Sequence, residues 1–117
     1  MRLNPYLNFN GQCEEAFKFY EKCLSGKIEM MLPHAGTPAA GHVPAEWQNK
    51  IMHARLTMGE NVLMGSDVPP DRYKVPSGFS VTLQIKNPAE AERIFSALSE
   101  KGTINMPIRA AKWCRSI

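Results

Sequence analysis

The feature that most constrains the fold is a strand-turn-helix pattern that occurs twice in the sequence. The stretch "PYLNFNGQCEEAFKFYEKCL" (5–24) predicts a strand, an Asn-Gly turn and an amphipathic helix, and "SVTLQIKNPAEAERIFSAL" (80–98) has the same order. Leu7 and Gly26 align with Leu83 and Gly102 at a spacing of 76 residues. The apolar helix positions of the two copies are 75 residues apart instead of 76, and a turn that is one residue shorter in the second copy explains the difference. Any two strand-helix-strand segments would align in part, but glycine and apolar positions agree across all three elements, which favours an internal duplication.

The apolar residues of the first copy follow helical spacing. Cys13, Phe17 and Tyr20 fall at i, i+4 and i+7, with charged residues on the opposite side, so a helix is predicted over 13–24. Glu14 and Lys18 form a favourable i,i+4 pair, and a glycine at 26 is a typical stop signal. In the second copy, the Asn-Pro start and the glycine at 102 predict a helix within 87–102.

The rest of the chain predicts short strands and two proline-rich connections. Strands are expected at 27–32, at 50–58 and 61–66 as a hairpin, at 79–86 and at 103–106. The long loop 33–49, with a helical turn at 44–48, is a candidate pocket wall. Within it, Trp47 holds the loop down or stacks on a ligand, and the first is favoured. Asp67, after the hairpin, is more typical of a turn cap than of a general base.

Composition indicates one globular domain of 117 residues with a mild net charge of +3. The basic residues are scattered, which argues against nucleic acid as a partner. Cys13 and Cys23 lie too far apart on one helix to bridge, so the three cysteines are expected to be reduced thiols of a cytoplasmic protein. No signal peptide and no membrane-spanning apolar run is present in the sequence, so no membrane is expected as a partner.

Four stretches together resemble the vicinal oxygen chelate superfamily, which includes glyoxalase I, bleomycin-resistance proteins and extradiol dioxygenases, and within it the PhnB-like branch. They are "PYLNFNGQCEEAFKFY", "KIMHARLTMGENVLMGSDVPP", "GFSVTLQI" and "GTINMP", and they cover most of residues 3–107. The resemblance implies an α+β fold: paired βαβββ modules form a curved mixed sheet around a small-molecule cleft, with helices on the convex face, usually in a dimer. Members of the branch are sometimes labelled methyltransferases, but no glycine-rich nucleotide-binding turn follows a strand here.

The match to the branch ends at "MP", after which the chain reads "IRAAKWCRSI". Truncation, a changed reading frame and a natural short form are all compatible with that ending. Within a single domain of 1–117, module one is expected at about 1–68, an incomplete module two at about 77–107 and an atypical tail at 108–117. A second module without its last two strands would leave an open sheet edge, which predicts a homodimer.

Strand alternation predicts which side chains face the cleft. Met52 and Leu56 on the strand 50–58 and Leu83 on the strand 79–86 are expected on the helix side. A solvated sheet face is equally compatible with the alternation alone, and the resemblance favours a pocket. The expected ligand-binding residues are Tyr6, Asn8, His53, Arg55, Thr57, Ser80, Thr82 and Gln84. Among these, Arg55 suits an anionic or oxygen-rich ligand, with a cross-strand ion pair as the alternative.

No metal site is expected. The resemblance implies His or Glu ligands at the first and last strands of each module, where this chain has Asn4 or Pro5, Ser80, and Met64 to Ser66. These are poor ligands for transition metals. A cluster of His34, His42 and His53 is a weaker alternative, because the spacing matches no known site. No cofactor is therefore expected.

The sequence thus predicts a protein that binds an unknown small organic ligand without the superfamily metal. The alternative is a metal-dependent isomerase, lyase or dioxygenase of the vicinal oxygen chelate type, and whether any reaction is catalysed stays open. A damaged relative without activity is a third possibility. The ligand positions discriminate between the first two, and they favour binding.

Overall fold

The computed structural model describes residues 1–100, 102 and 115–116 of the chain. These divide between two compact units, Met1–Pro76 and Ser77–Ile117, and each unit is described by itself. No helix in the described part of the chain is long and apolar enough to cross a membrane.

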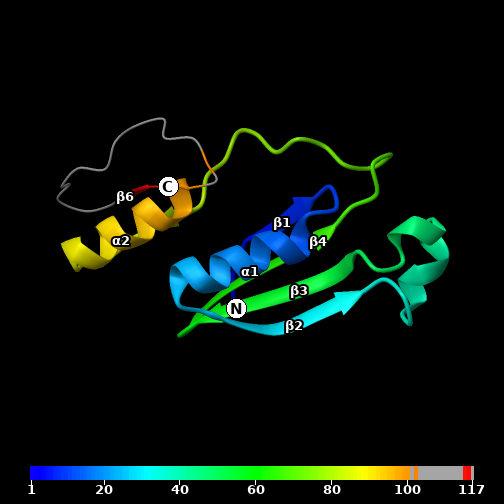
Figure 1. Cartoon of the computed structure of the whole chain (residues 1–117), viewed down its shortest axis with the longest axis horizontal. Coiled ribbons are helices and arrows are strands. Elements are labelled where there is room, and N and C mark those ends of the chain that lie inside the picture. The colour runs from blue at the N-terminus through cyan, green and yellow to red at the C-terminus, as the bar shows by residue number, and fades with distance from the viewer. Residues whose placement is uncertain (101, 103–114, 117) are drawn as a thin grey trace. The chain divides into compact units, whose positions relative to one another are not determined.

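The first unit is a βαβββ module. Its elements in chain order are β1 (Tyr6–Phe9), α1 (Cys13–Leu24), β2 (Lys27–Pro33), β3 (Ile51–Met58) and β4 (Asn61–Asp67). The strands form one mixed sheet in the order β1-β4-β3-β2, in which β1 runs parallel to β4 and the other pairs are antiparallel. Figure 1 shows α1 lying along this sheet. The predicted α+β class is confirmed by this arrangement.

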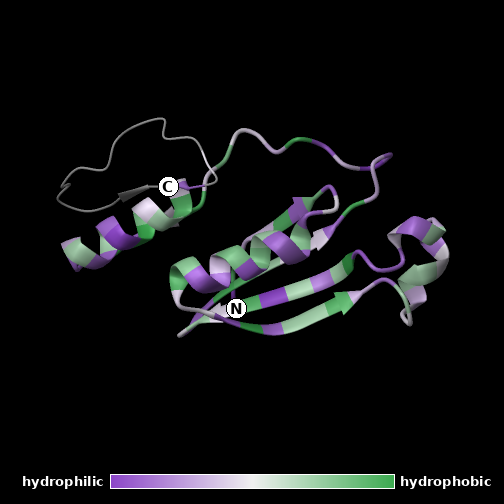
Figure 2. Cartoon of the chain, in the orientation of Figure 1, coloured by the Kyte–Doolittle hydropathy of each residue, from purple (hydrophilic) through white to green (hydrophobic). Residues whose placement is uncertain are grey.

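The core of the first unit lies between α1 and the sheet. Cys13 and Phe17 of the helix are fully buried, as their helical spacing predicts, and they meet Ala54, Leu56 and Leu63 of the hairpin. Burial of such apolar surface is the main force that holds a helix on a sheet. Figure 2 shows hydrophobic and hydrophilic residues alternating along β3, because only one face of the strand meets the helix.

The two ends of α1 use different devices. Gln12, at the N-cap, makes no side-chain cap, and the first helical N–H instead donates to Asp67 from β4. At the other end Ser25, not Gly26, adopts the left-handed conformation, with φ of 54°. The glycine is required for a different reason, since a Cβ at Gly26 would lie 2.9 Å from the carbonyl oxygen of Thr57.

One β-bulge changes the alternation at the start of β3. Leu32 pairs with His53 and Pro33 with Ile51, so Met52 is an extra residue without a partner. Ile51 therefore takes the core position that strict alternation assigns to Met52. The predicted alternation is wrong for Met52 and holds from Ala54 onward.

The loop between β2 and β3 contains two short 3-10 helices, η1 (Pro38–His42) and η2 (Ala45–Trp47). The second confirms the helical turn predicted at 44–48. Trp47 is only 9% exposed, and its ring lies 3.9 Å from a Cβ placed on Gly11. The side chain therefore holds the loop against the module, as was favoured from the sequence.

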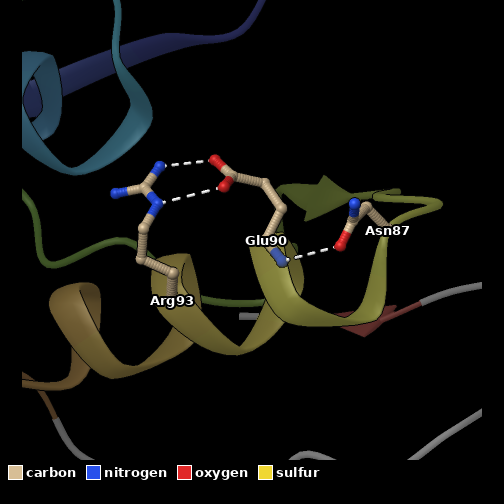
Figure 3. A network of polar contacts seen from close by, with 3 residues as sticks. All are labelled: Asn87, Glu90 and Arg93. Atoms are coloured by element: carbon tan, nitrogen blue, oxygen red, sulfur yellow. Dashed lines mark hydrogen bonds and ion pairs between the residues drawn. The ribbon is translucent and has the colours of Figure 1, made fainter.

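The second unit contains β5 (Thr82–Leu83), α2 (Pro88–Ser99) and β6 (Arg115–Ser116). The strand predicted over 79–86 is shorter in the structure, where β5 comprises only Thr82 and Leu83. These are the two residues that pair with β6, and a strand extends only as far as its partner. The start of α2 agrees with prediction. The Asn87 side chain accepts a hydrogen bond from Glu90 N–H at 3.1 Å, and Glu90 pairs with Arg93 one turn on (Figure 3). The strand predicted at 103–106 and most of the tail from 108 lie outside the described residues.

Candidate functional site

The sheet of the first unit has a second face, opposite α1, that carries most of the predicted site residues. Arg55 on β3 pairs with Met64 on β4, and Met64 pairs with Tyr6 on β1. Directly paired residues point to the same side of a sheet, so these three form one row across three strands. Adjacent positions extend the row on the same side. We call this surface the Tyr6 face, and it includes Tyr6, Asn8, Met30, Leu32, His53, Arg55, Thr57, Val62, Met64 and Ser66.

Tyr6 and His53 are in direct contact on this face. The Tyr6 hydroxyl and Nδ1 of His53 lie 3.1 Å apart, within hydrogen-bond distance. Their rings stack with centroids 5.7 Å apart and planes inclined by 27°. Tyr6 is well exposed to solvent, at 44%. The pair therefore offers a flat aromatic surface with polar edges to any molecule that lies on it.

Arg55 forms the cross-strand ion pair that was the alternative to ligand binding. Its Nε donates to Oε2 of Glu29 on β2 at 3.0 Å, and both side chains are partly exposed. Such exposed pairs contribute only about 0–1 kcal/mol to stability. Replacing Glu29 by the carboxylate of a ligand therefore costs little at this guanidinium.

Apolar side chains border these polar groups. Met30 and Leu32 of β2 are 39% and 40% exposed. Thr57 donates from Oγ1 to the Lys27 carbonyl at 3.4 Å, and Asn8 is exposed on β1. The Tyr6 face thus combines apolar contact area with a few polar groups, which is the usual composition of a small-molecule site.

The other three predicted residues belong to the second unit. Thr82 and Gln84 are exposed while Leu83 and Ile85 are partly buried, as alternation predicts, and Ser80 precedes β5. Whether Ser80, Thr82 and Gln84 line the same cleft as the Tyr6 face stays a prediction.

The histidines do not gather as one cluster. His34 and His42 line a pocket beneath the loop between β2 and β3, whereas His53 pairs with Tyr6. Within residues 1–100, 102 and 115–116, no group of three His, Cys, Asp or Glu side chains is arranged to hold a metal ion.

Sequence reasoning missed two structural carboxylates. Asp67 is 3% exposed, and its carboxylate accepts three backbone N–H bonds. The predicted capping role is correct, but the sequence did not indicate that one carboxylate would accept hydrogen bonds from three separate segments. Glu21, assigned to the polar side of the helix, accepts the Ile28 N–H at 2.7 Å. The only sequence signal for that contact is the seven-residue spacing across the turn at Ser25–Gly26.

A βαβββ module with one helix against a mixed sheet is the building unit of the vicinal oxygen chelate fold, and the comparisons with known proteins agree. The model of a family described as 3-demethylubiquinone-9 3-methyltransferase matches residues 1–116. The chain therefore belongs to this family, the PhnB-like branch of the superfamily.

Individual relatives support the same assignment. The chain is similar to protein YjdN of Escherichia coli (strain K12), with 28% identity over 97% of this chain and 82% of that protein. The crystal structure of protein PA1353 from Pseudomonas aeruginosa is 44% identical with a TM-score of 0.85, over 99% of this chain and 85% of that one. A putative 3-demethylubiquinone-9 3-methyltransferase, PhnB protein, from Bacillus cereus shares the fold, with 21% identity and a TM-score of 0.72. The match covers 92% of this chain and 80% of that one.

Proposed function

We propose that this protein binds a small organic molecule on the Tyr6 face, with Tyr6, His53 and Arg55 as its main contacts and without a resident transition metal. The contact between the Tyr6 hydroxyl and Nδ1 of His53, at 3.1 Å, carries the proposal. This contact holds two aromatic rings with hydrogen-bonding groups on the sheet face opposite α1. Tyr6 is exposed there, so packing of the core does not explain the pair.

The chemistry of the face indicates the kind of ligand. Stacked rings at Tyr6 and His53 favour a flat molecule, and the neighbouring Met30 and Leu32 favour an apolar body. The Arg55 guanidinium offers paired donors to a carboxylate. An aromatic acid combines these features, so benzoate is a suitable first probe.

The test is calorimetric titration of the protein with benzoate. We expect saturable binding, weakened about tenfold or more in Arg55→Gln, because charge-assisted hydrogen bonds contribute about 1.5–3 kcal/mol. Tyr6→Phe should weaken binding less, since only the hydroxyl is lost. Arg93→Gln is a matched control, because it breaks another exposed Arg–Glu pair, on α2. Absence of binding, or equal binding by Arg55→Gln, would contradict the proposal.

The absence of a resident metal has its own test. Asn4, Pro5 and Ser66 occupy positions at which the superfamily pattern calls for His or Glu. Elemental analysis of protein purified without chelators should find less than stoichiometric zinc, nickel, manganese and iron. A stoichiometric metal would favour the alternative, a metal-dependent isomerase, lyase or dioxygenase.

We also propose that the protein is a homodimer. Strand β2 lies at one edge of the described four-stranded sheet, and it carries the exposed Met30 and Leu32. An edge strand with apolar side chains favours association, and a two-fold interface covers the same surface on both chains. A second copy there would also border the Tyr6 face and shield a bound ligand from water.

A further inference from the structure

A pocket of about 280 Å³ lies beneath the loop between β2 and β3, apart from the three main contacts of the Tyr6 face. None of Tyr6, His53 and Arg55 lines it. Its walls come from that loop, from the bulge on β3, and from the end of β4 with the segment that follows it. Five of its ten lining residues are apolar, namely Ala39, Val43, Met52, Val68 and Pro69.

The loop that forms one wall is held in place by its own hydrogen bonds. The Ala35 N–H donates to the Gln48 carbonyl at 2.8 Å, and the Gln48 side-chain amide donates to the Ala40 carbonyl at 2.9 Å. Thr37 caps η1 by accepting the Ala39 N–H. Trp47 anchors the same loop in the module. The wall is therefore formed before any ligand arrives, which lowers the ordering cost of binding.

His34 is one of two buried polar residues in the lining, with 5% exposure, and the other is Asp67. Its Nδ1 lies 2.9 Å from the Lys50 carbonyl oxygen, and because a carbonyl only accepts, Nδ1 must carry the proton. In the neutral ring Nε2 is then an acceptor, and it forms no hydrogen bond with any described residue. No fully buried side-chain nitrogen in the described ranges lacks a partner, so Nε2 is not fully enclosed, and His34 is among the residues that line the pocket.

The charged groups of the pocket are already engaged. Asp67 lines it, but its carboxylate accepts N–H bonds from Gly11, Cys13 and Ile51. Arg72, also in the lining, donates from Nη2 to the His42 carbonyl at 3.3 Å. One negative and one positive side chain give no excess of charge, so the lining favours an uncharged ligand.

From this geometry we propose that the loop pocket binds a small neutral molecule with an apolar ring and a hydroxyl group, which donates a hydrogen bond to Nε2 of His34. The volume fits a single ring, and the apolar walls fit its body. The pocket meets the Tyr6 face at Ser66, which pairs with Asn8, but it contains none of the three main contacts of that face. The simplest member of its ligand class is phenol.

The test compares phenol with toluene on the full chain, by calorimetry and by the NMR signals of the histidine ring nitrogens. Phenol should saturate one site and shift Nε2 of His34. Toluene has similar shape but no donor, and it should bind about tenfold more weakly, since an unsatisfied buried acceptor costs about 1–3 kcal/mol. Equal affinity for the two would overturn the proposed hydrogen bond, and no saturable binding of phenol would overturn the site.

Two variants place the binding. His34→Asn keeps a donor for the Lys50 carbonyl but removes the acceptor at Nε2, so it should fold and lose phenol affinity about tenfold. Ala39→Phe places a larger side chain in the lining while His34 itself is unchanged, and it should also block phenol. It provides a second test in case His34→Asn does not fold. His53→Asn separates the two sites. Loss of phenol binding in His53→Asn, with binding retained in both pocket variants, would move phenol to the Tyr6 face and overturn the loop-pocket site.

Discussion

The Asp67 carboxylate accepts a hydrogen bond of 2.9 Å from the backbone N–H of Cys13, the first residue of α1. The same carboxylate accepts the Gly11 N–H at 3.0 Å and the Ile51 N–H at 2.8 Å. One side chain at the end of β4 thereby joins the turn after β1, the start of α1 and the start of β3. It replaces the local cap that Gln12 does not provide.

Replacing Asp67 by Ala should therefore destabilise the module strongly. Three buried or partly buried N–H groups would lose their acceptor, and at about 1–3 kcal/mol for each unsatisfied group we expect a loss of about 3 kcal/mol or more in the free energy of unfolding. Urea denaturation measures this. Asp71→Ala, at an exposed position, is the control and should change stability by less than about 0.5 kcal/mol. A stable Asp67→Ala would show that the three bonds have replacements.

Gly65→Ala is expected to disturb the contact between α1 and the sheet. A Cβ at Gly65 would lie 2.8 Å from the Leu7 carbonyl oxygen and 2.9 Å from Cε1 of Phe17. The oxygen belongs to the paired strand and cannot move alone, so we expect a cost of about 1–3 kcal/mol, as for overpacked cores. Thermal unfolding is the measurement. Gly41→Ala, where a Cβ meets nothing within 4 Å, should leave the melting temperature nearly unchanged.

Local periodicity was sufficient to predict the helix and the hairpin of the first unit. Cys13 and Phe17 lie one turn apart, and both are fully buried against the sheet. The same periodicity gave the shared face of Tyr6, His53 and Arg55, because strands alternate. These features depend only on neighbours along the chain.

The features that the sequence did not predict depend on distant partners. The bonds from Asp67 to Cys13 and Gly11 span 54 and 56 residues, and no pattern links such positions. The bulge at Met52 follows from the register with β2, which a single strand does not encode. The burial of His34 likewise depends on how the loop folds back onto Lys50.

Stability should fall at alkaline pH because of Cys13. Burial first, and then the Asp67 and Glu14 carboxylates, raise the pKa of this thiol from 9.0 to about 12. Between these values the folded chain keeps a proton that the unfolded chain has lost. The unfolded state therefore binds fewer protons, and the free energy of unfolding decreases as pH rises through this window.

Cys13→Ala isolates this contribution. The variant should be less stable at neutral pH, because it leaves a small cavity, but its stability should decline less steeply above about pH 9. Burial also raises the pKa of Tyr20, which contributes a decline of the same sign to both proteins. Urea denaturation at a series of pH values gives the two slopes. Parallel slopes would mean that the thiol does not titrate as this burial implies.

The proposed dimer predicts a mass in solution of twice the 13.1 kDa of one chain. Sedimentation across a dilution series measures it, and a single species of chain mass at micromolar concentration would reject the dimer. The contact is expected to include Leu32, which is 40% exposed on the edge strand β2. Leu32→Glu places a charge against its copy across a two-fold axis, so it should shift the equilibrium towards monomer.

Val75→Glu is the matched control for this contact. Val75 is more exposed than Leu32, at 80%, but it belongs to no strand of the sheet, so a charge there should leave the association unchanged. If both substitutions dissociate the protein equally, general hydrophobicity rather than the β2 edge holds the chains together. If neither does, the second copy lies on another surface, and Met30 and Leu32 are then available to a ligand alone. A shift confined to Leu32→Glu would place the partner chain beside the Tyr6 face, because Leu32 pairs with His53 across the two strands.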